Sequence, residues 1–367
     1  MQVQPEKTPT DLSKSTFKHP ELSLPWKGRV LQALGKQLLE VLKIPQKANE
    51  LVKTLLMSNT LVRTPLMLAS TIKADYSRGF ENYKLDYGGV GVELKTKENI
   101  SIQGMYFSAK DSQKNPFVRA CEYVGSKNES PREDGPTVIL CIGSDRSLFD
   151  PDNKSIYPDI IQSYLARGLN VMCFDYQGVG LSKGTFTEKG SYESVDVAME
   201  FVKSKGVPKD KILVEGYSMG SGPATHLASK NAGISLLLRN PFAKTSLAAK
   251  GFLEQEKIHW FWHKMAALVV DYLLEYNNIK KIDQVHGRIG LISAPGDMFA
   301  EKSQHVEKLA DAATKPGAKP TSFYHRLTAK DHFSTYAAEG EMAQSLDEYL
   351  VSIGFTKQIQ RNNLVCD

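Results

Sequence analysis

A serine between two glycines carries the clearest chemical signal in this chain. Gly216 and Gly220 lie two residues to either side of Ser218, and the apolar residues 212–214 come just before them. At a sharp turn from a strand to a helix, this spacing holds a serine hydroxyl clear of the sheet, where it can act as a nucleophile. Glycine suits both flanking positions because side chains there would collide with the neighbouring strand and helix. The five-residue pattern is common, so an acid, a histidine and an oxyanion donor must accompany it.

A carboxylate and an imidazole follow in the order that this chemistry needs. Asp297 and His332 each lie in a loop just after a late apolar run. If those runs are parallel strands, both side chains reach the carboxyl edge of the sheet, where ligands bind in open α/β folds. We predict that His332 takes the proton of Ser218. Asp297 would fix the tautomer of the histidine and stabilise its charged form.

Other residues compete for these two roles. Asp331 is adjacent to His332, and residues that are neighbours in sequence seldom bend back to orient each other. Asp175 ends an early apolar run and is expected to cap its own turn. The remaining histidines fall in the N-terminal segment or within or beside expected helices and strands: His19, His226, His259, His263, His286, His305 and His325. His332 therefore remains the predicted base.

Two backbone amides are expected to bind the oxyanion. The N–H of Met219 is one, because it comes just after the nucleophile at the positive end of the next helix. The second is expected in the turn after the apolar residues 137–142, and we assign it to Ser144. Gly143, just before it, would let the backbone approach the substrate closely.

Apolar runs and helical patterns alternate through most of the chain, which predicts βαβ units, a mostly parallel sheet and an α/β fold. The expected strands are 89–94, 100–107, 137–142, 170–174, 212–216, 234–238, 288–293 and 322–327. The first two form a hairpin. The expected helices are 157–167, 191–205, 301–313 and 333–353.

Two helical stretches lie outside this alternation. Residues 243–282 are strongly apolar, and they are either a lid over an acyl or lipid-like substrate or a cap that completes the core. Residues 26–64 are amphipathic with a basic polar face, and they either contact a membrane surface or pack against the main domain. We divide the chain into a polar N-terminus and helical extension at 1–80, a main domain at 81–355 and a tail at 356–367.

Composition excludes several classes of protein. The chain has 367 residues and a net charge of only +5, which does not favour nucleic acid as a partner. Its four cysteines show no CxxC pair and no metal-ligand spacing, so they predict neither a metal site nor a disulfide scaffold. We also expect no cofactor. The first 25 residues lack the apolar core of a signal peptide, and no apolar run is long enough for a transmembrane helix. We expect the protein to be located in the cytoplasm, or to be delivered into a host cell by a route that needs no signal peptide.

The chain resembles the α/β-hydrolase family across about residues 83–353. Residues 174–184, Phe-Asp-Tyr-Gln-Gly-Val-Gly-Leu-Ser-Lys-Gly, are similar to a glycine-rich turn of that family, and 216–220 are similar to its nucleophile turn. Residues 293–297 resemble its acid turn, and 331–332 its histidine turn, although the leading His-Gly of the acid turn is missing. In the oxyanion turn, Ile142 stands where the family often has histidine.

The resemblance implies an α/β-hydrolase fold, to which the patterns of residues 243–282 and 26–64 add a helical lid insertion and an N-terminal helical extension. The branch that looks most similar contains serine-aminopeptidase-like lipases and acyl-protein thioesterases. The extension resembles hydrolase-like effectors of intracellular bacteria, of the Legionella SidB type and their chlamydial relatives. We predict a serine hydrolase that cleaves an ester or thioester through an acyl-serine intermediate, with a small acyl or lipid-like substrate favoured. The alternative is a non-catalytic protein that uses the same fold to bind a membrane or a partner.

Overall fold

The structure is a computed structural model, and it describes residues 76–112, 127–128, 130–143, 147–150, 156–255, 275–294, 305–317, 321–326 and 341–358. The predicted residues Ser144, Asp297 and His332 lie outside these ranges, as do residues 26–64 and 256–274. Ser218, Met219 and the two flanking glycines lie within them.

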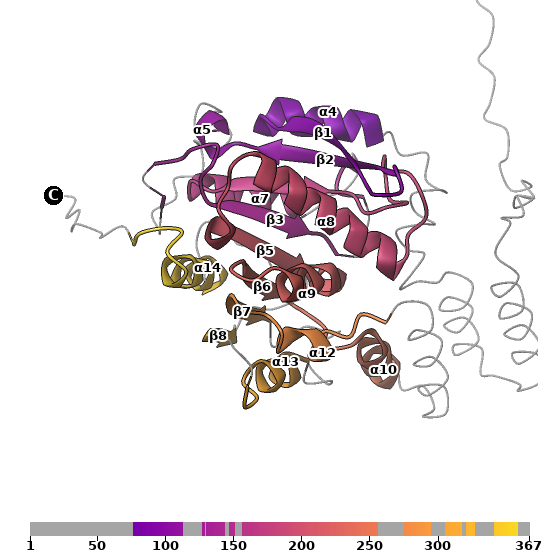
Figure 1. The fold of residues 1–367 in the computed structure, drawn as a ribbon, viewed down its shortest axis with the longest axis vertical. Coiled ribbons are helices and arrows are strands. Elements are labelled where there is room, and N and C mark those ends of the chain that lie inside the picture. The colour runs from indigo at the N-terminus through magenta and orange to yellow at the C-terminus, as the bar shows by residue number, and fades with distance from the viewer. Residues whose placement is uncertain are drawn as a thin grey trace, which may run out of the picture. The chain divides into compact units, whose positions relative to one another are not determined.

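An eight-stranded sheet forms the centre of the described fold, in the order β1-β2-β4-β3-β5-β6-β7-β8 (Figure 1). The strands are β1 Val90–Lys95, β2 Ser101–Phe107, β3 Thr137–Cys141, β4 Asn170–Phe174, β5 Ile212–Tyr217, β6 Ser235–Arg239, β7 Arg288–Ser293 and β8 Thr321–Arg326. Strands β1 and β2 form the expected antiparallel hairpin, β2 is also antiparallel to β4, and the strands from β4 to β8 pair in parallel. The prediction of a mostly parallel sheet is confirmed.

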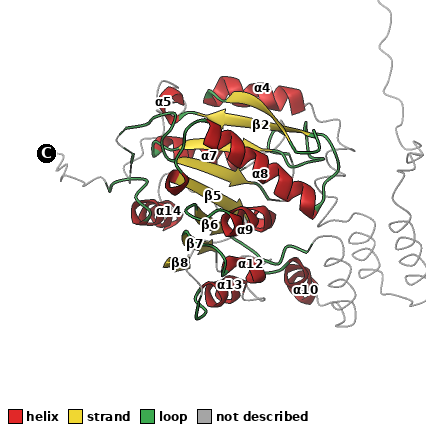
Figure 2. Ribbon diagram, viewed as in Figure 1, coloured by secondary structure: helices red, strands yellow, loops and turns green. Residues whose placement is uncertain are grey.

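Helices flank this sheet (Figure 2). The described helices are α4 Tyr76–Tyr87, α5 Ala109–Ser112, α7 Tyr157–Ala166, α8 Glu188–Ser204, α9 Ser221–Lys230, α10 Thr245–Gln255, α12 Ile279–Ile282, α13 His305–Ala313 and α14 Glu341–Ser352. Two short 3₁₀ turns, η1 Lys209–Lys211 and η2 Ser218–Gly220, flank β5. No helix within the described ranges is long and apolar enough to cross a membrane.

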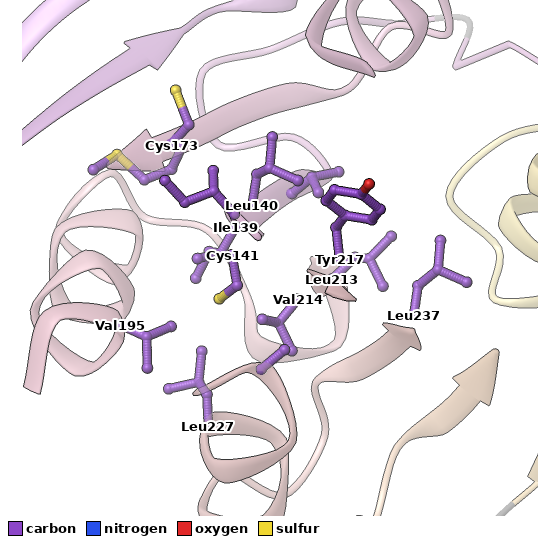
Figure 3. Packing of buried hydrophobic residues seen from close by; sticks show 14 of the residues in the cluster. Ile139, Leu140, Cys141, Cys173, Val195, Leu213, Val214, Tyr217, Leu227 and Leu237 are labelled. Carbon is purple, nitrogen blue, oxygen red and sulfur yellow. The ribbon is translucent and has the colours of Figure 1, made fainter. Parts of the chain in front are cut away.

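Consecutive residues of β5 show that helices cover both faces of the sheet. Gly216 faces Ala224 of α9, whereas the neighbouring Glu215 accepts a hydrogen bond from Tyr164 of α7. Because successive strand residues point to opposite faces, α9 and α7 lie on opposite sides of β5. Figure 3 shows side chains of α8 and α9, Val195 and Leu227, gathered beside Cys141 and Val214. The strands read as continuous apolar runs for this reason, since both of their faces are buried.

The helix α4 corrects one detail of the sequence reading. None of the helices that the sequence predicts lies directly before the strand 89–94, but α4 occupies Tyr76–Tyr87. Its buried residues Tyr76, Phe80 and Tyr83 recur at helical spacing. The rings of Phe80 and Tyr83 pack edge-on against Phe149, with centroids 4.8 Å and 5.6 Å away. Aromatic packing against the turn after β3 thus keeps these residues helical.

Candidate active site

Ser218 has the backbone geometry expected of a nucleophile at a sharp turn. It begins η2 between β5 and α9, and its φ is +51°, in the left-handed region. A side chain with a Cβ atom costs roughly 1–3 kcal/mol in such a conformation, so the surrounding structure must hold it there. The residue is half-buried, whereas Met219 after it is only 3% exposed. Within the turn from Gly216 to Gly220, the positive φ falls on Ser218, the residue predicted to do the chemistry.

Close packing explains the glycines on both sides of Ser218. A Cβ atom on Gly216 would lie 2.7 Å from the Cβ of Ala224 and from the carbonyl oxygen of Gly220. A Cβ on Gly220 would lie 2.1 Å from the carbonyl oxygen of Cys141. Both positions must therefore lack a side chain. The second contact also shows that η2 packs directly against the end of β3.

The backbone after β3 is held by two tyrosines. The hydroxyl of Tyr176 donates to the carbonyl oxygen of Ile142 at 2.9 Å, and the amide of Gly143 donates to the hydroxyl of Tyr157 at 2.7 Å. The amide of Gly143 is thus already engaged. The next amide, that of Ser144, is the predicted oxyanion donor and lies outside the described residues.

The strand ends that lead to Asp297 and His332 lie beside each other at the carboxyl edge of the sheet. Ser293 at the end of β7 pairs with Arg326 at the end of β8. Asn240, which has a φ of +47°, accepts a hydrogen bond from the amide of Ala294 at 2.9 Å and fixes the path of the chain out of β7. The side chains of Asp297 and His332 fall outside the described residues, so their assignment stays a prediction.

Two rival histidines in the described ranges have packing roles. His226 is buried in α9 and stacks on Tyr192 with ring centroids 3.9 Å apart. His305 is buried at the start of α13, where its Nδ1 accepts a hydrogen bond from the amide of Ala243 at 3.0 Å. Neither contact resembles a general base beside a serine hydroxyl.

Asp175 has a larger role than the turn-capping one expected of it. The residue is fully buried just after β4, and its carboxylate accepts hydrogen bonds from the hydroxyl of Ser147 at 2.5 Å and the amide of Leu148 at 2.7 Å. It therefore joins the chain after β4 to the chain after β3. The signal that could have revealed this is a carboxylate that directly follows a wholly buried strand.

The ionisation of Asp175 should make stability depend on pH. Burial raises the pKa of this carboxyl from 3.8 to about 7, although hydrogen bonds from Ser147, Leu148 and Leu181 oppose the shift. Because the folded-state pKa lies above the unfolded value, this group stabilises the fold below pH 4, and that contribution is lost as the pH rises to 7. Relative to wild type, Asp175→Asn should therefore gain about 2–3 kcal/mol in unfolding free energy between pH 5 and pH 8. Urea denaturation of both proteins across this range measures the difference. If the unfolding free energies of the two proteins changed with pH in parallel, Asp175 would not be the group with the raised pKa.

A buried ion pair lies beneath the nucleophile turn. Arg239 at the end of β6 donates from Nε to the carboxylate of Glu215 in β5 at 3.0 Å, and both side chains are fully buried. The hydroxyl of Tyr164 donates to the other carboxylate oxygen at 2.5 Å. The Arg239 guanidinium also lies over the ring of Tyr217, 4.2 Å from its centroid. The sequence reading missed this pair, although a glutamate inside an apolar strand was a visible signal.

Comparisons with known proteins identify the fold. No protein-family model matches the chain. The chain resembles an α/β hydrolase of Vibrio vulnificus with a TM-score of 0.55 and 18% identity, over 78% of this chain and 89% of that one. It also resembles an esterase of Pyrococcus furiosus with a TM-score of 0.54 and 18% identity, over 74% and 93% of the two chains. The fold is therefore an α/β-hydrolase fold, as predicted.

Sequence relatives match shorter stretches. An uncharacterised protein of Mycobacterium tuberculosis is 29% identical over 183 residues, which cover 50% of this chain and 59% of the relative. The α/β hydrolase domain-containing protein aho-3 of Caenorhabditis elegans is 42% identical over 73 residues, 20% of this chain and 22% of the relative. The chain thus spans less than two thirds of the length of these relatives.

Proposed function

We propose that this protein is a serine hydrolase that cleaves an ester or thioester through an acyl-serine intermediate. The observation that carries the proposal is the left-handed backbone of Ser218, at the turn between β5 and α9. A serine bears that strain where the surroundings impose it, and strained residues cluster at active sites. The esterase among the structural neighbours and the hydrolase-domain relatives favour the same class of reaction.

The proposed reaction uses each predicted residue once in each half-cycle. His332 removes the proton from the Ser218 hydroxyl as its oxygen attacks the acyl carbon, and Asp297 stabilises the imidazolium that forms. The amides of Met219 and Ser144 bind the oxygen of the tetrahedral intermediate. His332 then gives its proton to the leaving alcohol or thiol. A water molecule repeats the sequence on the acyl-serine and releases the acid.

We also propose that the substrate carries an acyl or lipid-like group. The apolar segment 243–282 favours an acyl or lipid-like group, and its described parts include α10 and α12. The test is hydrolysis of a series of p-nitrophenyl esters and acyl thioesters of increasing chain length, with Ser218→Ala as the control. A rise in kcat/KM from acetyl to longer acyl chains supports an acyl or lipid substrate, and a flat or falling series contradicts it.

The rate should rise with pH through a single ionisation. His332 must be neutral to accept the proton of Ser218, so kcat/KM should increase as the imidazole loses its proton and then level off. The measurement is kcat/KM for a short ester from pH 5 to pH 9, with stability followed at each pH to separate inactivation from titration. A flat profile between pH 5 and pH 8 would exclude His332 as the general base.

The alternative is a non-catalytic protein that uses this fold for binding. This alternative would be supported if the folded wild-type protein neither hydrolysed esters nor reacted with a serine-directed probe.

Peripheral membrane contact through residues 26–64, an effector role and the location of the protein stay predictions. Removal of residues 1–64 tests the first of these by co-sedimentation with anionic vesicles.

A further inference from the structure

We propose that Asp175 and Gly180 position the backbone after β3 for catalysis, so that this glycine-rich turn acts on the rate of the proposed hydrolysis and not only on folding. The inference rests on the proposed function, because the second oxyanion donor is assigned to the same stretch of backbone. Both residues lie within 174–184, the stretch that resembles a glycine-rich turn of the α/β-hydrolase family.

The contacts form a chain between two loops at the carboxyl edge of the sheet. One carboxylate oxygen of Asp175 accepts from the Leu148 amide, and the other accepts from the Ser147 hydroxyl. The Ser147 oxygen in turn accepts from the amide of Phe149 at 3.1 Å. These bonds hold residues 147–149, which follow the turn after β3. Tyr176 holds Ile142, which precedes this turn, through its carbonyl oxygen.

Gly180 gives this contact the space it needs. Its φ is +53°, and a Cβ atom there would lie 2.1 Å from Oδ2 of Asp175 and 2.4 Å from Oγ of Ser147. A methyl group would therefore push apart the two atoms that join the loops. The main chain of Asp175 is fixed as well, because its carbonyl accepts from the Ser182 hydroxyl at 2.8 Å and its amide donates to the carbonyl of Gln103 at 3.0 Å.

The first residues of the same turn, Cys141 and Ile142, pack against the nucleophile turn. A Cβ atom on Gly220 would lie 2.1 Å from the carbonyl oxygen of Cys141 and 2.7 Å from that of Ile142. We therefore expect a displacement of the backbone after β3 to shift the groups that lie beside Ser218. Misplacement of catalytic groups by about 1 Å can cost about a hundredfold in rate. Substrate binding through the acyl chain does not need the same precision.

The test compares Asp175→Asn and Gly180→Ala with Gly206→Ala and with wild type at pH 8. Gly206 is a matched control because its φ is +81° and the nearest atom to an added Cβ is 3.8 Å away. Each protein is titrated for active sites with a fluorophosphonate, and kcat and KM are measured for p-nitrophenyl butyrate. We expect kcat per active site to fall about 10- to 100-fold for the two loop variants, with KM within about twofold of wild type. The control should keep both constants.

Two further measurements separate positioning from folding. Amide hydrogen exchange at Leu148 and Phe149 should be faster in both loop variants than in wild type and in Gly206→Ala. At pH 8, Asp175→Asn should be no less stable than wild type, since it removes a buried charge, and yet be slower. A purely structural role predicts the opposite, in which stability falls and kcat per active site stays unchanged. That result, or unchanged exchange at both amides, would overturn the inference.

If the proposed function is wrong, the experiment gives a different result. In that case the wild-type protein itself would neither hydrolyse the ester nor react with the probe, and the inference would fall with it. An active wild type with equally active loop variants would overturn the inference alone.

Discussion

Replacing Ser218 with alanine should lower kcat for ester hydrolysis by about 10⁴-fold or more, because it removes the atom that forms the covalent intermediate. KM should change little, since the hydroxyl contributes little to binding of the acyl group. The fold should persist, because alanine keeps the Cβ atom and lacks only the hydroxyl group of serine. Purified protein assayed with p-nitrophenyl butyrate, with folding followed by circular dichroism, gives both values.

A second substitution at the same position separates chemistry from backbone strain. Ser218→Gly should be as inactive as Ser218→Ala, but it should be more stable by about 1 kcal/mol, because glycine adopts a φ of +51° without steric cost. Equal stability of the two variants would mean that the turn carries no strain. An alanine variant with more than a tenth of the wild-type rate would mean that Ser218 is not the nucleophile.

Loss of one partner of the buried Glu215–Arg239 pair should have the largest effect on stability. Glu215→Leu removes the carboxylate that the Arg239 guanidinium contacts at 3.0 Å, and it keeps a side chain of similar size. Breaking a buried pair in this way costs about 3–5 kcal/mol, because a charge stays in an environment that water does not reach. Urea denaturation at pH 7.5 measures the change in unfolding free energy.

The double variant Glu215→Leu/Arg239→Met provides the control. It removes both charges and keeps most of the buried volume, so it should recover at least half of the stability lost in the single variant. A double variant that is less stable than Glu215→Leu would show that the ion pair itself holds the strands together. Activity should fall in the single variant if Arg239 also steadies Tyr217, whose ring it covers next to Ser218.

Much of the fold was predictable because local pattern and burial agree. The strands 137–142 and 170–174 appear as apolar runs since both of their faces are covered, and the structure places β3 and β4 there. Gly216 and Gly220 were predictable because the chemistry of the turn requires their missing side chains. In α4, by contrast, the contact with Phe149 depends on a residue more than sixty positions away, which periodicity within 76–87 does not reveal.

The polar network around the site was the least predictable part. Asp175 lies beside one apolar strand and Glu215 within another, but their partners come from other loops and strands. Such pairing depends on the order of strands in the sheet, in which β3 lies between β4 and β5. Spacing along the chain does not contain that order, so from the sequence alone Asp175 is expected only to cap its own turn.

The nucleophile itself is tested by mapping the site of covalent modification. Wild-type protein, Ser218→Ala, Asp297→Asn and His332→Ala would each be treated with a fluorophosphonate, and the modified peptide identified by mass spectrometry. We predict one adduct per wild-type chain, at Ser218, much slower modification of Asp297→Asn and His332→Ala, and none at this peptide in Ser218→Ala. An adduct at another residue, or a folded wild-type protein that stays unmodified, would contradict the assignment of Ser218 as an activated nucleophile.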